Sequence, residues 1–400
     1  MKLVSLLGMG CGSDDTLTVG ARQRLEEAGL LIGAARLLKE PPHLEAERVD
    51  AVRSADIIHV ILNSAAERIC VLFSGDTGFY SGAKTLIPLL ERERVDYEVL
   101  PGISSLQYLA AKLGTSWQNW RLCSAHGVDC DPVAELCQGK PVFFLTGGAL
   151  GPAELCRRIT EAGLGELKVA VGEELSYPTE RIATGTAADF ARGDFAPLSV
   201  LLAEAPEIQP RRTPGIPDEE FQRGKVPMTK QEVRCAILAK LAVTPEDVCW
   251  DVGAGTGSVS VELALQGKSA WAVEEKEEAC ELIRANRQNF CAWKLHLTQG
   301  SAVEVLPDFP RPDKVFIGGS RGDLDEIIGI ALEANPAARI CVSAITLENL
   351  HTAMESLQAR GCEVEVAQIS VSRTKAAANL HLLLAQNPVF LIMGVRPCGD

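Results

Sequence analysis

The chain has 400 residues, more than one ordinary domain, and its 46% hydrophobic and 23% charged residues are typical of a globular protein. Its net charge of −14 and the lack of any lysine- or arginine-rich run argue against binding to nucleic acid or to a membrane surface. No apolar stretch reaches the roughly 18–20 residues that span a bilayer. The apolar start runs directly into a glycine-rich turn rather than an export signal, so we expect a cytoplasmic protein.

The cysteines do not indicate a metal site. All 13 are dispersed along the chain, without a Cys-x-x-Cys pair. Cys123, Cys130 and Cys137 recur every seven residues, but metal ligands need matched spacings that converge. We therefore expect reduced thiols and no metal.

A proline-rich segment divides the sequence. It begins at Ala205 and contains four prolines with little apolar periodicity, so it cannot continue a helix or a central strand. We predict a first domain of residues 1–205, a linker of residues 206–217 and a second domain of residues 218–400.

Both domains alternate short β-branched runs with longer helical stretches, which predicts the α/β class. In the first domain we predict strands at Leu3–Leu7, Ile69–Phe73 and Val142–Leu145 and a helix at Thr18–Ala28. Each of these strands ends in a glycine-rich turn, which places backbone N–H groups at the ligand-binding edge of a sheet.

The second domain has the regular succession of a doubly wound, Rossmann-like sheet. We predict helices at Thr229–Leu241, Ser258–Leu265 and Glu278–Asn289 and strands at Val248–Val252, Ala270–Glu274, Leu295–Thr298, Lys314–Ile317 and Arg339–Ser343.

The loop Gly253–Gly257 lies between a predicted strand and a predicted helix, where glycines permit a tight turn and close approach of a ligand. Glu274 ends the next strand at about the distance expected for an acid that binds ribose hydroxyls. The third glycine of the dinucleotide fingerprint is replaced by Ser258, and the carboxylate of Asp251 beside the loop would repel a pyrophosphate. These features favour S-adenosylmethionine over NAD.

The end of a later strand, Phe316–Ser320, constrains the methyl acceptor. Its Gly318 and Gly319 replace the carbonyl-rich motif that holds an exocyclic amine of a base, so we expect a bulky ligand or a carbon nucleophile. Two other readings stay open at this point: a methyltransferase acting on RNA or protein, and a nicotinamide-dependent oxidoreductase.

Several separated blocks of the second domain resemble the C15-methylating, decarboxylating enzymes of cobalamin biosynthesis. The blocks are Pro227–Arg234, Trp250–Glu262, Phe316–Ser320, Ile345–Glu348 and Asn387–Phe390. The first domain resembles the C5-methylating branch of the tetrapyrrole methylases at Gly8–Gly12, Leu17–Ala21, Ser74–Ser81, Pro101–Ser105 and Ser124–Gly127. Both halves together resemble the fused C5,15-methylating, decarboxylating family that acts on precorrins.

The resemblance implies two different binding sites for S-adenosylmethionine. In the second domain, a class I methyltransferase fold, the expected donor contacts are Thr229, Gly253, Ala254, Gly255, Thr256, Gly257, Glu274 and Ala302. In the first, a two-lobed α/β domain with the donor between the lobes, they are Gly10, Asp76, Gly78, Ser104 and Ser105. It further implies a polycarboxylate tetrapyrrole as substrate and a homo-oligomer formed through the C-terminal domain.

An acidic protein needs local positive charge to hold such a substrate. We predict His126, Arg234 and Arg373 as substrate-binding residues, with a solvated linker as the alternative reading for the arginines near residue 212. His381 lies in an apolar strand-like run and is expected in a core or at a sheet edge. No general base is predicted.

The sequence departs from the resembled families at a few positions. Thr77 stands where the methylases usually have proline, Ser343 stands where asparagine is expected, and Asn379 replaces a glycine. The differences at Ser343 and Asn379 weaken the inference that residues near the tetrapyrrole have the same roles here as in the resembled families.

Overall fold

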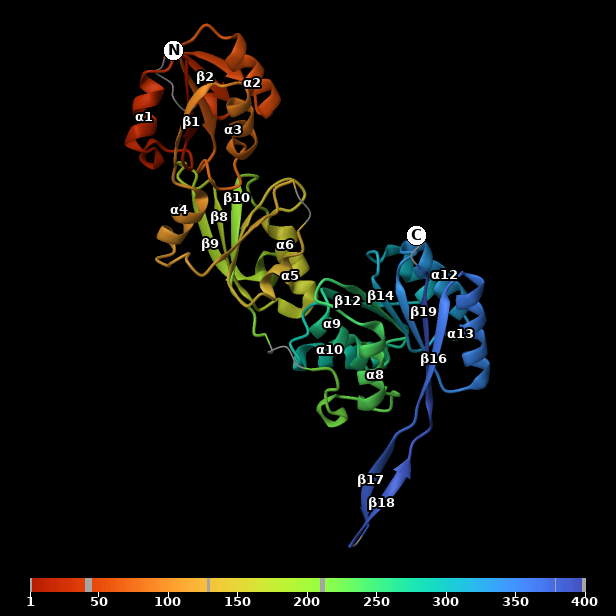
Figure 1. The fold of residues 1–400 in the computed structure, drawn as a ribbon. Helices are drawn as coiled ribbons and strands as arrows, with labels where there is room; N and C mark the ends of the chain where they lie inside the picture. Colours follow the sequence, from red (N-terminus) through yellow and green to blue (C-terminus); the bar gives the residue numbers. More distant parts are fainter. Residues whose placement is uncertain (1, 40–44, 128–129, 209–212, 378, 398–400) are drawn as a thin grey trace. The chain divides into compact units, whose positions relative to one another are not determined.

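The computed structural model describes residues 2–39, 45–127, 130–208, 213–377 and 379–397. The chain divides into two compact units whose main boundary lies between Ala205 and Pro206, with the short segments Cys137–Gly139 and Glu161–Leu164 grouped with the second unit. Figure 1 shows the elements of both units in sequence colours. None of the described helices combines the length and hydrophobicity that a membrane-spanning helix requires.

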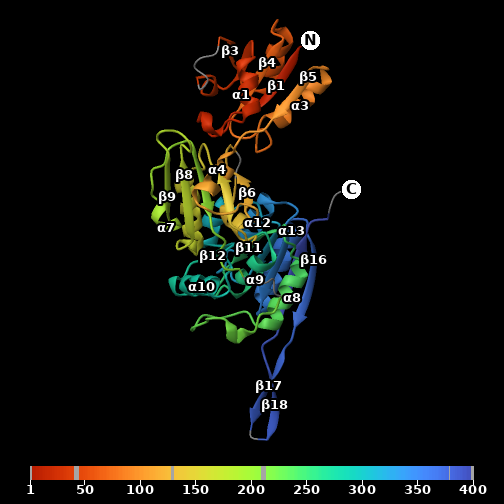
Figure 2. The ribbon, with the colours of Figure 1, turned by 90° about the vertical axis from the view of Figure 1, so that its left-hand side faces the viewer.

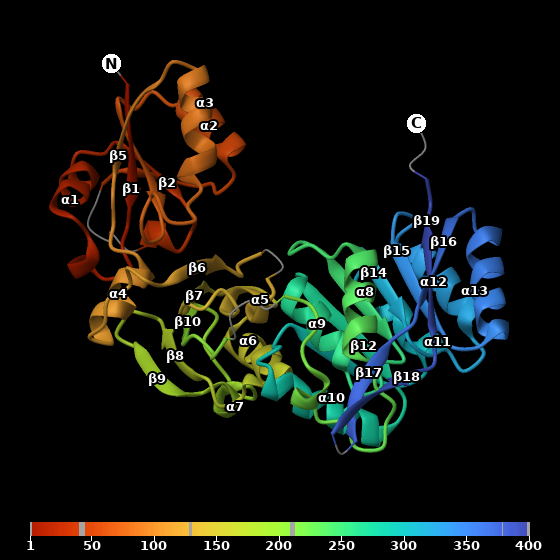
Figure 3. The same cartoon turned by 60° about the horizontal axis from the view of Figure 1, so that its bottom comes forward.

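The first lobe of the first unit is a parallel sheet with helices on both faces. Its strands are β1 (Leu3–Gly8), β2 (Leu30–Gly33), β3 (Glu47–Asp50), β4 (Arg68–Phe73) and β5 (Asp96–Leu100), and its helices are α1 (Val19–Glu26), α2 (Ser54–Asn63) and α3 (Ala83–Arg92). The strand order is β3-β2-β4-β1-β5. Alternate residues of β1 enter two different apolar cores, one with α2 and α3 and the other with α1. Figure 3 shows α1 on one side of this sheet and α2 and α3 on the other.

The second lobe is a mixed sheet. Its strands are β6 (Arg121–Ser124), β7 (Val142–Leu145), β8 (Lys168–Glu173), β9 (Arg181–Thr186) and β10 (Ser199–Ala203), and its helices are α4 (Ser105–Lys112), α5 (Pro132–Leu136), α6 (Pro152–Ile159) and α7 (Ala187–Phe190). The order is β6-β7-β10-β8-β9, with only β6 and β7 parallel. Leu106 and Leu109 of α4 share a core with Phe143 of β7.

The second unit is a seven-stranded sheet between two helical layers. Its strands are β11 (Val248–Val252), β12 (Ser269–Glu274), β13 (Leu295–Gln299), β14 (Lys314–Ile317), β15 (Arg339–Ala344), β16 (Glu363–Ile369) and β19 (Val389–Val395). Its helices are α8 (Gln231–Leu241), α9 (Ser258–Gln266), α10 (Glu277–Asn289), α11 (Ala302–Val305), α12 (Leu324–Ala334) and α13 (Leu347–Ala359). The order is β13-β12-β11-β14-β15-β19-β16, and only β19 is antiparallel to its neighbours.

Side-chain alternation along β11 and β14 explains the two layers. Cys249 and Phe316 pack with α8, α9 and α10, whereas Trp250 and Ile317 pack with α12 and α13. The strand order reverses between β11 and β14, which opens a crevice at the carboxyl ends of these strands. The predicted α/β class, the two-lobed first domain and the doubly wound second domain are confirmed.

A two-stranded arm extends from the seven-stranded sheet between β16 and β19. It consists of β17 (Ser372–Ala377) and β18 (Leu380–Ala385), which pair antiparallel with each other. Figures 1 and 2 both show this arm projecting beyond the sheet. Leu380 and Leu383 are 68% and 71% exposed, and His381 is exposed too. His381 is therefore not in a core but on an edge strand, and that strand belongs to the two-stranded arm.

The end of the predicted linker is held by the second unit. The backbone N–H groups of Gly215 and Ile216 donate to the Glu262 carboxylate at 2.7 and 3.2 Å, and the Ile216 side chain is buried. Residues 209–212 of the linker lie outside the described residues.

Candidate functional sites

The glycine loop of the second unit follows β11 and leads into α9. Gly253 and Gly255 have φ values of 71° and 58°, in the left-handed region that favours glycine. A Cβ atom on Gly253 would lie 2.5 Å from the Gly319 carbonyl oxygen. The close approach of these two loops therefore requires glycine at 253.

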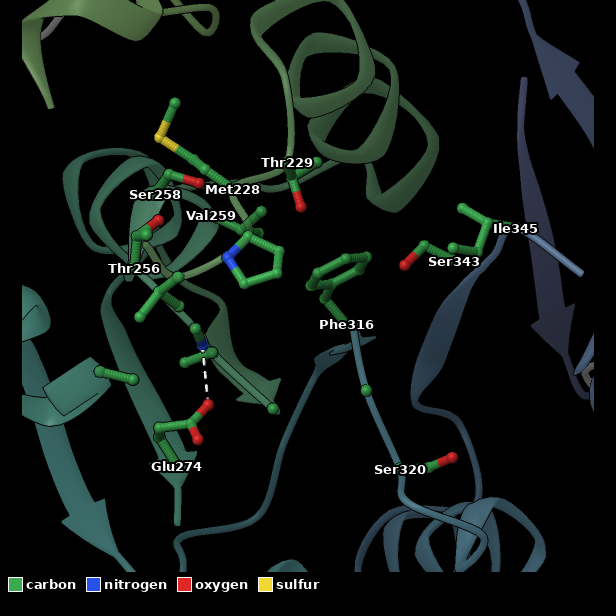
Figure 4. A pocket seen from close by; sticks show the side chains of 18 of the residues that line it. Met228, Thr229, Thr256, Ser258, Val259, Glu274, Phe316, Ser320, Ser343 and Ile345 are labelled. Atoms are coloured by element: carbon green, nitrogen blue, oxygen red, sulfur yellow. Dashed lines mark hydrogen bonds between the residues drawn. The ribbon is translucent and has the colours of Figure 1, made fainter. Parts of the chain in front are cut away.

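Glu274 is fixed at the end of β12 facing this loop. Its carboxylate accepts hydrogen bonds from the backbone N–H groups of Gly255 at 2.9 Å, Glu275 at 3.0 Å and Lys276 at 3.1 Å. Figure 4 shows the bond to the loop as a dashed line. A carboxylate has about four acceptor positions, so Glu274 keeps acceptor capacity for a ribose hydroxyl. The open glycine backbone and this fixed acid fit the nucleoside part of S-adenosylmethionine.

Asp251 does not face the ligand. Its side chain is 1% exposed within β11, and one carboxyl oxygen accepts a hydrogen bond from the Ser260 hydroxyl. The other carboxyl oxygen has no hydrogen-bond partner among the described residues. Burial raises the pKa of Asp251 to about 7. The sequence argument that this carboxylate would repel a pyrophosphate is therefore wrong. The preference for S-adenosylmethionine over NAD rests on the loop and Glu274.

The loop opens into a pocket of about 630 Å³. Most of the predicted donor residues line it, namely Thr229, Gly253, Ala254, Gly255, Thr256, Glu274 and Ala302. Gly257 lies behind the loop as the residue preceding α9, and its added Cβ would meet Ile283 rather than the pocket.

Further lining residues were not among the predicted donor contacts, although Phe316 belongs to the strand end predicted to constrain the methyl acceptor. They include Met228, Phe316, Ser343, Ile345 and Val389. Figure 4 shows the Phe316 ring between Glu274 on one side and Ser343 and Ile345 on the other, with Thr229 above it. Phe316 lies in a predicted strand, and the structure shows that its ring forms a wall of the pocket.

Two predicted substrate ligands have other partners. Arg234 is fully buried, and its guanidinium donates to Glu262 at 2.8 Å, to Asp218 at 2.9 Å and to the Thr229 carbonyl. It also lies 4.7 Å from the centre of the Phe221 ring. The prediction for Arg234 is wrong, because a substrate cannot reach a fully buried group whose donors are used.

Arg373 at the base of the arm is paired with acids as well. It donates to both Glu232 carboxylate oxygens, at 3.0 and 2.6 Å, and lies 3.1 Å from the Asp218 carboxylate. Both arginines thus form ion pairs with Asp218, and together they connect the arm to α8 and α9. This network gives Arg373 a structural role, and Arg373 does not line the pocket.

The first unit has its own cleft of about 320 Å³ between its two lobes. Among the predicted residues, Gly10, Asp76, Ser104, Ser105 and His126 line it. Gly78 does not line it, but its N–H donates to the Asp76 carboxylate at 2.7 Å.

The cleft is built from three loops of the first lobe that pack closely together. The backbones of Gly10 and Gly75 exchange hydrogen bonds of 3.1 and 2.8 Å, and Asp76 also accepts from the Gly102 N–H at 3.1 Å. Cβ atoms on Gly8 or Gly102 would clash with the facing backbone at 2.3–2.9 Å. Asp76 therefore fixes the turn that closes the floor of the cleft.

The second lobe contributes residues that the sequence did not indicate. Gly172, Leu175 and residues 197–200 line the cleft opposite the glycine loops. From the first lobe, Arg36 also lines it and donates to the Tyr177 hydroxyl at 2.6 Å and to Ser74 at 3.1 Å. None of these segments carries a recognisable sequence motif, so only the folded structure shows that they line the cleft.

No disulfide joins the described cysteines. The sulfur atoms of Cys123 and Cys130 lie 3.0 Å apart. No group of three His, Cys, Asp or Glu side chains suited to a metal occurs in the part of the chain that the structure describes.

Comparison with known proteins identifies the family. The precorrin-6Y C(5,15)-methyltransferase [decarboxylating] of a Sinorhizobium species is 30% identical over 354 residues, which cover 85% of this chain and 84% of that protein. The chain belongs to the family of precorrin-6Y C(5,15)-methyltransferases (decarboxylating). It is therefore an enzyme, a methyltransferase of this family.

Each unit, taken separately, is also similar to known proteins. The family model for tetrapyrrole (corrin/porphyrin) methylases matches residues 3–191, and the model for the precorrin methyltransferase domain matches residues 219–396. A probable cobalt-precorrin-6B C(15)-methyltransferase (decarboxylating) of Pyrobaculum calidifontis is 43% identical over 188 residues, covering 46% of this chain and 96% of that protein. The crystal structure of a precorrin-6Y C5,15-methyltransferase from Geobacter metallireducens is 38% identical and covers 46% of this chain and 98% of its own, with a TM-score of 0.45.

Proposed function

We propose that the chain methylates a precorrin at C5 and C15 and decarboxylates its C12 acetate, with S-adenosylmethionine as methyl donor, in cobalamin biosynthesis. The observation that carries this proposal is the presence of two separate ligand spaces, one in each unit. Each is lined by most of the residues expected to contact a methyl donor.

In the second unit the chain's own residues orient the reactants. Glu274 offers acceptors for ribose hydroxyls, and the glycine loop allows close approach to the backbone. Ala302 and Thr229 border the remaining space. The bound donor supplies a methyl group on a positively charged sulfur. Positioning two reactants and excluding water supply much of the rate enhancement for such a transfer, so no general base is required.

In the first unit we propose that Gly10, Asp76, Gly78, Ser104 and Ser105 form the donor side of the cleft. Ser104 caps α4 and is buried, whereas Ser105 begins the helix and lines the cleft. His126, which is exposed and lines the same cleft, remains our candidate for contact with the substrate.

The substrate is proposed to be a tetrapyrrole that carries several carboxylates. With Arg234 and Arg373 occupied by acids, the second unit presents Lys230 and Lys276 at the pocket as counter-charges. Free thiols in the described part of the chain fit the reducing cytoplasm, where we place the enzyme.

The direct test is mass spectrometry of the product after incubation of the full chain with precorrin-6Y and S-adenosylmethionine. We expect two added methyl groups and the loss of one CO2. No change in mass with competent substrate would overturn the proposal.

The Gly255→Arg variant separates the two reactions. Position 255 has φ of 58° and borders the pocket, so an arginine there fills donor space and strains the loop. We expect one added methyl group, at C5, with the acetate retained. Addition of both methyl groups by this variant would contradict the assignment of the donor site in the second unit.

We also propose that the enzyme is a homo-oligomer assembled through the β17–β18 arm. Four leucines of β18 are 48–71% exposed, and an apolar strand with a free edge is suited to pair with the same strand of a second copy. Sedimentation of the wild type should show an oligomer, and the double variant Leu382→Lys, Leu384→Lys should shift it toward the monomer. A monomeric wild type at micromolar concentration would refute this assembly.

A further inference from the structure

The charged residues that line the pocket of the second unit lie between Lys230 and Asp323 in the sequence. They are Lys230, Glu274, Glu275, Lys276, Arg321 and Asp323. Every lining residue beyond Asp323 is neutral. The strands β15, β16 and β19 and the segments beside them therefore contribute no ionisable side chain to the pocket.

We call these uncharged lining residues, together with the Phe316 ring, the neutral end: Phe316, Ser343, Ile345, Asn349, Ile369, Val371, Gln386, Asn387 and Val389. It is formed by the ends of β14 and β15 and by the strands at the base of the arm. Figure 4 shows Ser343 and Ile345 across the Phe316 ring from Glu274, with the Ser343 hydroxyl directed toward that ring. Ser343 is half-buried and has no hydrogen-bond partner among the described residues, whereas Ile345 is 69% exposed.

The polarity of such a surface matters for decarboxylation. A carboxylate concentrates its charge on two oxygens, and this charge is dispersed as the carbon–carbon bond breaks. A cation beside the carboxylate stabilises the starting state and slows the reaction. A surface of apolar side chains with a few uncharged hydroxyl and amide groups removes water from the carboxylate without offering a counter-charge.

We propose that the neutral end receives the acetate that leaves as CO2, while Lys230 and Lys276 attract the carboxylates that are kept. This inference rests on the proposed function and adds to it the position of one substrate group. The bond between the acetate methylene carbon and its carboxylate carbon breaks, and CO2 leaves. The electron pair passes into a protonated ring imine of the macrocycle, and a proton from water then adds to the methylene carbon, which becomes a methyl group.

The test places a cation in the neutral end. Ile345 is suited to this because its exposure lets a lysine fold without burying a charge. We expect Ile345→Lys to release CO2 at least about tenfold more slowly than Ile345→Met, which has similar length and no charge. The full chain is incubated with precorrin-6Y and S-adenosylmethionine, and both CO2 release and product mass are followed.

The control is Leu347→Lys, which adds the same charge at a residue that is also 69% exposed but does not line the pocket. It should release CO2 at the wild-type rate. Calorimetry should show the same affinity for S-adenosylmethionine in all three variants, which separates the effect from misfolding.

The outcomes distinguish the two levels of the proposal. A lysine variant as fast as the methionine variant, or a control as slow as Ile345→Lys, overturns the inference and leaves the proposed function standing. A wild type that methylates precorrin-6Y without releasing CO2 overturns the decarboxylase part of the proposed function itself.

Discussion

The two ligand spaces are built in different ways. The pocket of the second unit lies at the carboxyl edge of one sheet, where the strand order reverses between β11 and β14. The cleft of the first unit lies between a parallel sheet and a mixed sheet and takes residues from both. In the proposed function the chain therefore binds one kind of ligand twice, once at the edge of a single sheet and once in a space between two lobes.

The glycines reflect this difference. In the second unit Gly255 borders the pocket, where its added Cβ would make no contact closer than 3.3 Å. In the first unit Gly8 and Gly102 allow two backbone segments to touch each other. Gly253 of the second unit likewise lets its loop touch Gly319, so we expect both sites to depend on loop packing and the second also on the free space beside Gly255.

The largest expected effect comes from filling the cleft of the first unit. Ser105→Trp places a large ring at the first residue of α4, where the side chain lines the cleft. We expect C5 methylation to fall by about a hundredfold or more, because a displaced donor loses its alignment with the acceptor. C15 methylation and decarboxylation should continue when the C5-methylated product of Gly255→Arg is supplied as substrate.

The matched control is Ser116→Trp, at an exposed serine outside the cleft. It should methylate C5 like the wild type. Loss of both methylations in Ser105→Trp would show that the two sites are not independent.

A smaller effect is expected on the pH dependence of the stability of the second unit, where Asp251 is buried. The pKa of buried Asp251 rises from 3.8 to about 7 on folding, so the unfolded chain loses this proton at a lower pH than the folded chain. Stability of the wild type should therefore fall as pH rises from about 4 to about 7, by up to about 4 kcal/mol.

Asp251→Asn removes this ionisation and keeps an acceptor for Ser260. Its stability gain over the wild type should be near zero at pH 4 and largest above pH 7, as measured by denaturant unfolding. The transition of the first unit serves as the internal reference. An equal gain at both pH values would contradict the assigned burial of the charge.

The smallest effect is expected for Lys230→Met. Lys230 is half-buried and lines the pocket without a partner among the described residues. A partly exposed ion pair contributes about 0.2–1 kcal/mol, so KM for the C15 reaction should rise by up to about fivefold with little change in kcat. The exposed Lys225 does not line the pocket, and Lys225→Met should leave KM unchanged. A fall in kcat without a change in KM would argue against a role in holding carboxylates.

The sequence was informative where a site is continuous in the chain. The strand–loop–helix around Gly253–Gly257 and the strand ending at Glu274 have burial patterns that dictate their structure, and β11, α9 and α10 begin within one residue of their predicted positions. The donor residues follow from that local geometry. Phe316, Ser343 and Val389 come from three strands, and their meeting depends on the order β14-β15-β19, which no local pattern encodes.

Charges and apolar runs were the least predictable features. Arg234 belongs to a basic segment that looks solvent-exposed, yet its counter-charges Asp218 and Glu262 lie 16 and 28 residues away and bury it. The apolar run Leu380–Leu384 has the composition of a core strand, but the chain places it on the arm. The environment of Arg234 is thus made by residues distant in the sequence. For the arm leucines, the proposed cover comes from a second copy of the chain.

The exposed leucines of the arm have a consequence for how the enzyme responds to dilution. If a second copy covers them, association and folding of the second unit are linked by mass action. The melting temperature of that unit should then fall as the protein is diluted, while that of the first unit stays constant. The C15 and decarboxylation activities would accordingly be lost on dilution at temperatures where C5 methylation still persists.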